Sequence, residues 1–276
     1  MDAPAQHDKD AGGPLLTVSI VTFRPDPDEL ARTLASLETA LAGFDPASIA
    51  IFIIDNSAQD TVSPLLAGMF TGLTVRFLHG HGNIGFGRGH NLALAGSGRF
   101  HLILNPDIEM EADALHQGVD FMQAHPACGL LTPMAFWPDG TRQYLCKHFP
   151  AVFDLVLRGF APAPVRRLFE ARLSRYEMRA ETGEDVFRDP PIVSGCFMLF
   201  RGSLLRELQG FDPGYLLYFE DFDLSLRSAA RSRTVYVPAV RIVHAGGHAA
   251  RKGLWHIRQF ARSALRFYRK HGLKLF

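Results

Sequence analysis

Four short segments of the sequence carry side chains that could do chemistry. Asp55 directly follows the apolar run IFII, and Asp107 ends the segment LILNPD. Glu220 and Asp221 are adjacent in GFDPGYLLYFEDFDLSLR, and His244 ends the run VYVPAVRIVH. Carboxylates can hold a divalent cation or accept a proton, and an imidazole can do either as well. The four segments therefore predict a metal site, a general base or both.

Each segment also has an ordinary structural interpretation. Asp-Asn-Ser and Asn-Pro-Asp are common turn sequences. The acidic cluster of the third segment could cap a helix, with Asp223 paired to Arg227 one turn later. His244 and His248 are separated by glycines and lack the helical HExxH spacing of a metalloprotease. Taken singly, no segment decides between a structural and a catalytic role.

A glycine-rich segment, GNIGFGRGHN, covers residues 82–91. We expect Gly85, Gly87 and Gly89 to let the backbone approach a ligand, and a helix starting over Gly89–Ala95 to point free N–H groups at an anion. The glycine spacing is not that of a dinucleotide fingerprint, and the lysine of a P-loop is missing. No G-x-S-x-G nucleophile elbow occurs either, so serine hydrolase chemistry has no support.

The elements that must position these residues alternate between strand and helix patterns. Nearly continuous apolar runs predict strands at Leu16–Phe23, Ile49–Ile54, Leu73–Leu78 and His101–Leu104. Helical spacing starts at Asp28 and again over Glu111–His125, and further strands are expected at Val193–Phe200 and Thr234–Val237. This alternation predicts an α/β fold with a mainly parallel sheet, whose carboxyl edge would collect the polar residues that follow the strands.

Composition and charge narrow the function further. A formal net charge of +1 argues against a protein that coats nucleic acid. Three cysteines without a CxxC pair suit a reducing compartment and exclude a zinc ribbon. No secretory signal and no apolar stretch of about 18 residues occurs. We therefore expect a cytoplasmic protein, able to rest on the inner face of the plasma membrane.

The domain organisation is expected to be simple. Residues 1–13 are polar and predict a disordered lead-in, and 14–250 predict one domain with a nucleotide-binding half (14–110) and a catalytic half (111–250). Two segments, 153–179 and 251–276, predict basic amphipathic helices. In the second, the expected apolar stripe is Leu254, Ile257, Ala261, Ala264, Leu265 and Tyr268. Its arginines could meet anionic lipid or form the solvated face of a helix packed on the domain.

In their order along the chain, these motifs resemble family 2 of the glycosyltransferases. The matching segments are VSIVTF, IIDNS, GNIGFGRGHN, LNPD, SGCFMLFRGSLL, GFDPGYLLYFEDFDLSLR and a late VH, from Leu16 to His248. The resemblance implies a GT-A type fold, in which a mainly parallel, Rossmann-like sheet is flanked by helices. It also implies metal-dependent, inverting transfer of a sugar from a nucleoside diphosphate to an acceptor hydroxyl.

The resemblance also implies roles for single residues. Asp221 would be the catalytic base, and Glu220 would position the acceptor or tune that base. Asp107 and His244 would hold a divalent cation, Mg²⁺ or Mn²⁺, although Asn105 replaces the first acid of the family's D-x-D. The residues implied to bind the nucleotide-sugar are Thr22, Asp55, Asn83, Gly85, Phe86, Arg88, Asn91 and Asn105.

The C-terminal segment is most similar to bacterial rhamnosyltransferases of lipopolysaccharide O-antigen and cell-wall glycan synthesis. That similarity implies dTDP-rhamnose as donor, a glycan or lipid-linked acceptor and peripheral membrane contact, with no nucleic-acid partner. A homodimer is compatible with the sequence. Two alternatives stay open: a non-catalytic nucleotide- or glycan-binding protein on the same fold, and a sugar nucleotidyltransferase.

Overall fold

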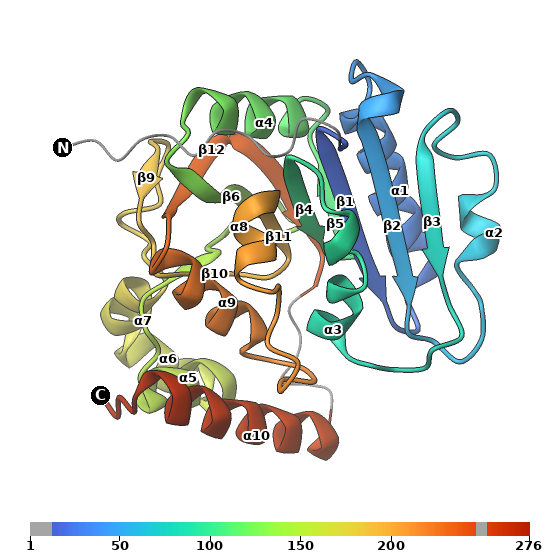
Figure 1. Cartoon of the computed structure of the whole chain (residues 1–276). Helices are drawn as coiled ribbons and strands as arrows, with labels where there is room; N and C mark the ends of the chain where they lie inside the picture. The colour runs from blue at the N-terminus through green and yellow to red at the C-terminus, as the bar shows by residue number, and fades with distance from the viewer. Residues whose placement is uncertain (1–12, 247–252) are drawn as a thin grey trace.

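A computed structural model describes residues 13–246 and 253–276, and Figure 1 shows the chain. Most of the predicted lead-in (1–13), His248 and the start of the predicted C-terminal segment (251–252) lie outside the described residues. The helices are α1 (Pro27–Ala40), α2 (Ser63–Leu66), α3 (Phe86–Asn91), α4 (Ala114–Ala124), α5 (Val152–Phe160), α6 (Ala163–Leu168), α7 (Glu170–Tyr176), α8 (Gly202–Glu207), α9 (Glu220–Ala229) and α10 (Leu254–His271), with short 3-10 turns at Pro46–Ser48 and Leu94–Gly96.

The N-terminal half holds four parallel strands in the order β3-β2-β1-β4. They are β1 (Leu16–Thr22), β2 (Ile49–Asp55), β3 (Thr74–Leu78) and β4 (Phe100–Leu104). Every residue of β1, β2 and β4 is buried, because helices cover both faces of this part of the sheet. Thr22 and Asp55 are register partners at the carboxyl ends of β1 and β2. The predicted parallel sheet and its polar edge are thus confirmed.

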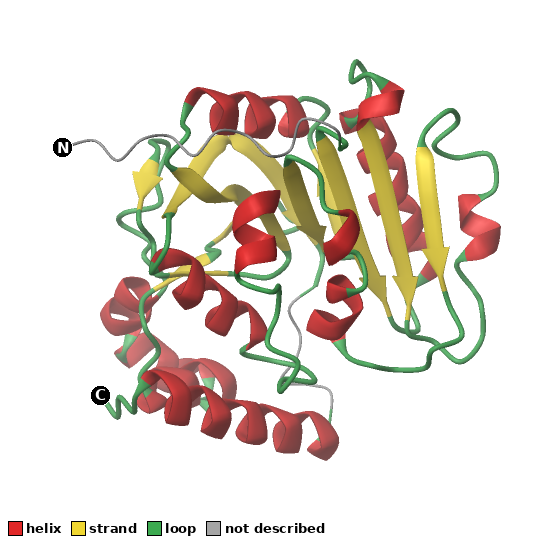
Figure 2. Cartoon of the chain, viewed as in Figure 1, coloured by secondary structure: helices red, strands yellow, loops and turns green. Residues whose placement is uncertain are grey.

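The same sheet continues through the second half of the chain in the order β4-β11-β6-β12-β5. The remaining strands are β5 (Ile108–Met110), β6 (Cys128–Phe136), β7 (Arg142–Gln143), β8 (Cys146–Lys147), β9 (Phe187–Arg188), β10 (Ile192–Val193), β11 (Phe197–Arg201) and β12 (Arg233–His244). β11 is antiparallel to both neighbours, whereas β12 is parallel to β6. The fold is therefore α/β with a mixed, mostly parallel sheet, as Figure 2 shows.

Two layers of helix enclose the sheet. On one face, α1 and α4 bury leucines against the strands in the largest apolar cluster, which includes Leu34 and Leu115. On the other face, α8 and α9 contribute Leu204 and Leu224 to a second cluster. α9 thereby lies on the sheet face that also carries α3, and its first turn faces the carboxyl edge of the sheet. The helix that carries Glu220 and Asp221 is thus anchored by core packing.

Three predicted elements differ from the structure. The expected strand over 193–200 is split into β10 and β11, because the backbone N–H groups of Ser194 and Gly195 bond to Leu145 and Asp221 instead of to a strand. The expected strand at Thr234–Val237 is longer and forms β12. α3 begins at Phe86, three residues before the predicted start.

The two predicted basic amphipathic segments are also resolved. Residues 153–179 form three short helices, α5 to α7, broken at the Pro-rich sequence as the pattern indicated. α10 packs on the domain through Phe260, Ala264, Phe267 and Tyr268, which join Tyr215 and other aromatic residues in one cluster. Ile257 and Leu265 of the predicted stripe are instead 42% and 51% exposed. The buried face of α10 is therefore rotated from the one predicted.

Candidate active site

A cavity of about 840 Å³ opens where the carboxyl ends of the strands meet α9. Its lining combines Asn105, Asp107 and His244 from the sheet edge with Glu220 and Asp221 from the start of α9. The far wall is built by α5, α6, α7 and the first half of α10. The structure thus brings the three predicted catalytic and metal-binding segments into one hollow.

The turn before α9 holds Glu220 and Asp221 in the cavity. Tyr218 and Phe219 have φ angles of 70° and 65°, a left-handed conformation that costs a non-glycine residue about 1–3 kcal/mol. Burial of the Phe219 ring among α10 aromatic residues and a 2.8 Å contact of Tyr218 Oη with His256 Nδ1 stabilise the turn. Two strained residues directly before a buried carboxylate pair are typical of a functional site.

The two carboxylates have different surroundings. Asp221 accepts hydrogen bonds from the backbone N–H groups of Gly195 and Phe222, both at 2.9 Å. Glu220 is 5% exposed, and its Oε2 has no hydrogen-bond partner among the described residues. Burial and the neighbouring Asp221 raise the pKa of Glu220 to about 8, and burial also raises the pKa of Asp221. Because Asp221 accepts N–H bonds from two other residues, whereas Glu220 Oε2 has no partner among the described residues, we assign the ionised form to Asp221 and the shared proton to Glu220.

Asp107 and His244 also line the cavity, with 3.4 Å between Asp107 Oδ1 and His244 Nε2. Gln143 Oε1 lies 2.8 Å from His244 Nδ1 and fixes the orientation of the ring. Asp107 Oδ1 is buried and accepts no hydrogen bond within the described part of the chain. Burial disfavours both charged forms, but the pair and its neighbours Asn105 and Cys196 lower the pKa of Asp107 and raise that of His244 to about 10.

These two residues fit a cation that takes most of its ligands from a substrate. A carboxylate oxygen that accepts no hydrogen bond among the described residues suits Mg²⁺ or Mn²⁺, and the His244 ring, fixed by its second bond, would have to give up its Nε2 proton to join as a ligand. No group of three or more His, Cys, Asp or Glu side chains suited to a metal occurs in residues 13–246 and 253–276. A cation here would therefore depend on a diphosphate to complete its ligands.

Two of the predicted nucleotide residues, Thr22 and Asp55, lie at the sheet edge but outside the lining of this cavity. Thr22 Oγ1 donates to Asp55 Oδ1 at 2.9 Å. Asp55 Oδ2 is buried without a hydrogen-bond partner among the described residues and lies 3.8 Å from His79 Nε2. His79 was not predicted from the sequence. An unpartnered carboxylate oxygen in this position could still accept a bond from a base or ribose.

The glycine-rich segment is packed more tightly than predicted. A Cβ at Gly87 or Gly89 would lie 2.7 Å from Phe211 or 2.8 Å from Val21, and one at Gly85, where φ is 92°, would overlap Leu216. The glycines thus serve close packing of α3 on the sheet and loops. Close packing alone accounts for glycine at these three positions, so a role in bringing the backbone to a ligand stays a prediction.

The polar side chains of this segment are also engaged within the protein. Asn83 Oδ1 accepts from the Gly85 N–H at 3.1 Å. Asn91 bonds both the N–H and the C=O of Phe211, and Arg88 donates to Pro213 O. Of the predicted nucleotide-sugar residues, Phe86 and Asn105 line the cavity, whereas Thr22, Asp55, Asn83, Gly85, Arg88 and Asn91 do not. Roles for this second group remain predictions.

The cavity includes residues that sequence reasoning did not single out. Gly195 lies against Asp221, and a Cβ there would come within 2.9 Å of Asp221 Cβ. Gly195 belongs to the segment SGCFMLF, and this position could have drawn attention to it in the sequence. The far wall contributes Arg158, Arg166, Arg167 and Arg179, all from the segment predicted to be basic.

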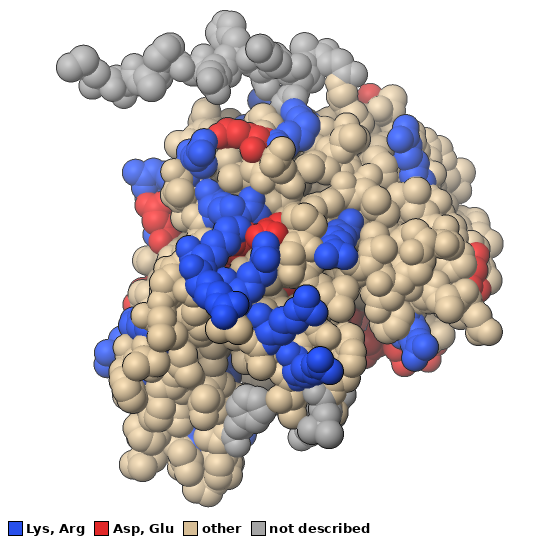
Figure 3. Space-filling view, turned by 60° about the horizontal axis from the view of Figure 1, so that its bottom comes forward, with Lys and Arg blue, Asp and Glu red and all other residues tan. Residues whose placement is uncertain are grey.

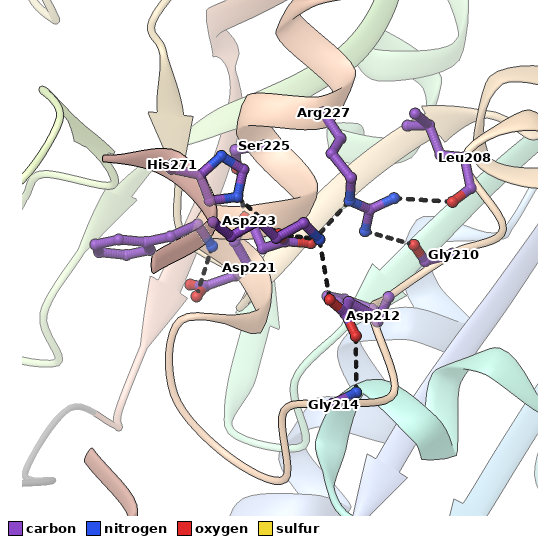
Figure 4. Close-up of polar contacts among 12 residues, drawn as sticks. Leu208, Gly210, Asp212, Gly214, Asp221, Asp223, Ser225, Arg227 and His271 are labelled. Carbon is purple, nitrogen blue, oxygen red and sulfur yellow. Dashed lines mark hydrogen bonds and ion pairs between the residues drawn. The ribbon is translucent and has the colours of Figure 1, made fainter. Parts of the chain in front are cut away.

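A network of ion pairs joins α10 to α9 and to the loop before α9 (Figure 4). Asp223 is fully buried and accepts from Arg227 at 2.7 Å, while His271 Nε2 lies 2.8 Å from its Oδ1. Arg266 and Lys270 bond Asp212 in the loop before α9. The predicted Asp223–Arg227 pair therefore exists, but as part of a larger anchor for the C-terminal helix.

The outer side of α10 is strongly basic. Figure 3 looks onto the side of the molecule that carries this helix and shows Lys and Arg side chains gathered in a band across it. Arg262, Arg266, Arg269 and Lys270 line a groove of about 660 Å³ together with Arg88. None of the described helices is both long and apolar enough to cross a bilayer.

Comparison with known proteins agrees with this architecture, although no family model matches the chain. The N-acetylglucosaminyl-diphospho-decaprenol L-rhamnosyltransferase of Mycobacterium tuberculosis is 28% identical over 248 residues, covering 85% of this chain and 77% of that protein. The rhamnosyltransferase WbbL of Escherichia coli is 28% identical over 194 residues, covering 64% and 69%. This chain is a relative of bacterial rhamnosyltransferases.

Solved structures extend the similarity to the fold. The mannosyltransferase PcManGT from Pyrobaculum calidifontis, in complex with GDP-Man and Mn²⁺, superimposes with a TM-score of 0.60 at 18% identity, covering 93% of this chain and 66% of that one. GalNAc-T7 with UDP, GalNAc and Mn²⁺ gives a TM-score of 0.61 at 16% identity, covering 84% and 43%. The predicted GT-A fold is confirmed.

Proposed function

We propose that this rhamnosyltransferase relative is an inverting glycosyltransferase that transfers a sugar from a nucleoside diphosphate to an acceptor hydroxyl. The observation that carries the proposal is one cavity lined by two pairs of side chains. The first is a carboxylate pair, buried Glu220 and half-buried Asp221, and the second is a cation-compatible pair, Asp107 and His244. A general base and a diphosphate site in one cavity are what direct displacement at an anomeric carbon needs.

In the proposed reaction, Asp221 removes the proton of the acceptor hydroxyl while the oxygen attacks the anomeric carbon. Asp221 uses each oxygen once, towards Gly195 and Phe222, so a lone pair remains for the acceptor proton. Glu220, protonated, places no second negative charge beside the base and can donate a hydrogen bond to the acceptor. Attack on the side opposite the departing diphosphate inverts the anomeric configuration.

Asp107 and His244 would hold the divalent cation in the donor site. When bound, the cation supplies positive charge to the departing diphosphate. Asn105 replaces an acid beside Asp107, so the protein offers one carboxylate here, and we expect cation binding to strengthen when the nucleotide is present.

We propose dTDP-rhamnose as the donor and a lipid-diphosphate-linked glycan of surface polysaccharide synthesis as the acceptor. Support comes from the relatives, one of which is a rhamnosyltransferase acting on N-acetylglucosaminyl-diphospho-decaprenol. The outward side of α10 supports a place at an anionic bilayer surface. Arg258, Arg262 and Arg269 are exposed there without an ion pair among the described residues, beside the half-exposed Trp255.

The first test is a calorimetric titration of the protein with the diphosphates of thymidine, uridine and guanosine, each with and without Mg²⁺ or Mn²⁺. We expect cation-dependent binding that favours thymidine diphosphate. Preference for uridine would keep the enzyme class and reject rhamnose as the sugar. Absence of binding under all conditions would contradict the transferase assignment.

The companion variant is Asp221→Asn, which is nearly isosteric and cannot act as a base. We expect it to abolish transfer to N-acetylglucosaminyl-diphospho-prenol while nucleotide binding stays within roughly three-fold, because Asp221 meets the acceptor and not the nucleotide. Undiminished transfer would remove Asp221 from the role of base. Release of pyrophosphate instead of nucleoside diphosphate would indicate a nucleotidyltransferase.

A further inference from the structure

We infer that Arg166 and Arg167 of α6 form a subsite for the diphosphate of a prenyl-diphosphate-linked acceptor. This inference rests on the proposed function, because it assigns the acceptor side of the same cavity. Both residues line that cavity together with Glu220 and Asp221.

The first support is that these two guanidinium groups have no partner. Other arginines of the same wall are paired: Arg158 with Glu177 at 3.2 Å, and Arg179 with Glu170 at 2.6 Å. Arg166 and Arg167 are exposed and have no ion pair and no side-chain hydrogen bond within the described residues. Two adjacent cations that face one hollow repel each other unless an anion lies between or beside them.

The second support is their position relative to the base. The wall that carries them continues into Arg158, whose charge acts on Asp221. The donor diphosphate is assigned to the sheet edge at Asp107 and His244, which belongs to a different set of elements. An anion held on α6 would therefore be a second phosphate group, attached to the molecule whose hydroxyl meets Asp221.

The third support is the apolar surface next to the two arginines. On α5 and α6, Val156, Val165 and Leu168 are 48%, 38% and 79% exposed. In a prenyl-diphosphate glycan, the diphosphate joins a polar sugar to an apolar chain. A basic pair that lines the carboxylate cavity, with exposed aliphatic side chains on the same and the preceding helix, offers a surface for each of these groups.

Arginine suits this ligand for geometric reasons. A guanidinium group donates two parallel N–H bonds to a phosphate, and two neighbouring arginines can address the two phosphates of a diphosphate. A neutral glycan acceptor has no group that would need them. The alternative source of the anion is the headgroup of a bilayer lipid, and the experiment separates the two.

The test is a calorimetric titration of the full chain with farnesyl diphosphate, with the donor site saturated by the nucleoside diphosphate and Mg²⁺. The variant is Arg166→Gln/Arg167→Gln. The matched control is Arg175→Gln/Arg188→Gln, which also removes two positive charges, from exposed positions on α7 and β9 outside the cavity lining. We expect the double variant to bind roughly ten-fold or more weakly, and the control to stay within about two-fold of the wild type.

Three further measurements decide how the titration result is interpreted. Farnesol should bind weakly and equally to all three proteins, because it lacks the diphosphate. Phosphatidylglycerol vesicles should be bound equally by Arg166→Gln/Arg167→Gln and by the control Arg175→Gln/Arg188→Gln; a selective loss with Arg166→Gln/Arg167→Gln would assign the pair to lipid headgroups instead. Equal farnesyl diphosphate affinity in wild type and double variant would overturn the inference.

Kinetics separate this inference from the proposed function. With N-acetylglucosaminyl-diphospho-farnesol, the double variant should raise the acceptor KM roughly ten-fold and leave kcat and the donor KM unchanged. With an alkyl N-acetylglucosaminide, which has no phosphate, wild type and double variant should behave alike. If the wild type transfers no sugar and binds no nucleotide, the proposed function fails, whereas the farnesyl diphosphate titration without nucleotide still tests the subsite.

Discussion

The shared proton of Glu220 and Asp221 should be visible in how the stability of the protein depends on pH. Glu220 has an ordinary pKa of 4.5, and burial next to Asp221 raises it to about 8 in the folded protein. Between these two values the folded state binds one proton more than the unfolded state. The free energy of unfolding must therefore fall as the pH rises through this window, and Glu220→Gln removes that dependence.

The size of the effect follows from the proton count. One proton of difference corresponds to about 1.36 kcal/mol per pH unit. Between pH 5.5 and pH 7.5, both inside the window, the wild type should lose about 2–3 kcal/mol relative to Glu220→Gln. The side chain is 5% exposed, so solvent screening reduces this value little.

The assay is urea unfolding of the ligand-free wild type and Glu220→Gln at a series of pH values, and the quantity compared is the difference between their free energies of unfolding. Asp221→Asn serves as a second variant. It removes the neighbouring charge but leaves Glu220 buried, so part of the slope should persist. A difference between wild type and Glu220→Gln that stays constant from pH 5.5 to 7.5 would refute the assignment of the proton.

Two further predictions concern the surroundings of the base and the outer face of α10. Gly195→Ala places a Cβ 2.9 Å from Asp221 Cβ, so it should displace the base and lower kcat by roughly ten- to a hundred-fold, with nucleotide affinity unchanged by calorimetry. Equal losses in kcat and nucleotide binding would indicate general misfolding instead. Arg262→Gln/Arg269→Gln should weaken co-sedimentation with phosphatidylglycerol vesicles by about 2 kcal/mol, on the order of 1 kcal/mol per arginine, and leave phosphatidylcholine vesicles unaffected. Unchanged co-sedimentation would argue against a bilayer contact through α10.

The parallel half of the fold could be predicted from sequence because its signals are local. Each strand of that half is an apolar run that ends in a polar turn, and the parallel topology brings Asp55 and Thr22 to one edge without further information. Asp107 follows the same rule at the end of β4. These predictions needed no knowledge of which side chains meet in space.

The remaining features depend on contacts between distant segments. Phe86-Gly-Arg-Gly has weak helix propensity, yet α3 starts there because Gly87 and Gly89 fit against Phe211 and Val21. The buried face of α10 is chosen by Tyr215 and Phe219, whose positions the sequence does not reveal. In both helices, tertiary packing decided the start or the buried face that local sequence patterns had not predicted.

The sequence also does not show which arginines of the basic segments form ion pairs. The arginines of 153–179 look alike in sequence, and both basic segments are predicted as cationic helices. In the structure, Arg158, Arg172 and Arg179 are paired with acids, whereas Arg166, Arg167 and Arg175 are exposed and have no ion pair among the described residues. The acids belong to the same segment, so the packing of its short helices on one another decides which arginines are paired.

Ion pairs and aromatic packing hold α10 against α9, the helix that begins with Glu220 and Asp221. Asp223 lies two residues after Asp221 on α9, is fully buried, and is bonded by Arg227, Lys270 and His271. Phe219, in the strained turn before Glu220, packs against the aromatic residues of α10. Within the basic stripe of α10, Arg266 and Lys270 bond Asp212 before α9, while Arg258, Arg262 and Arg269 stay exposed without an ion pair among the described residues. A surface bound by the outward arginines would thus place the cavity, and the acceptor that enters it, at a fixed orientation to that surface.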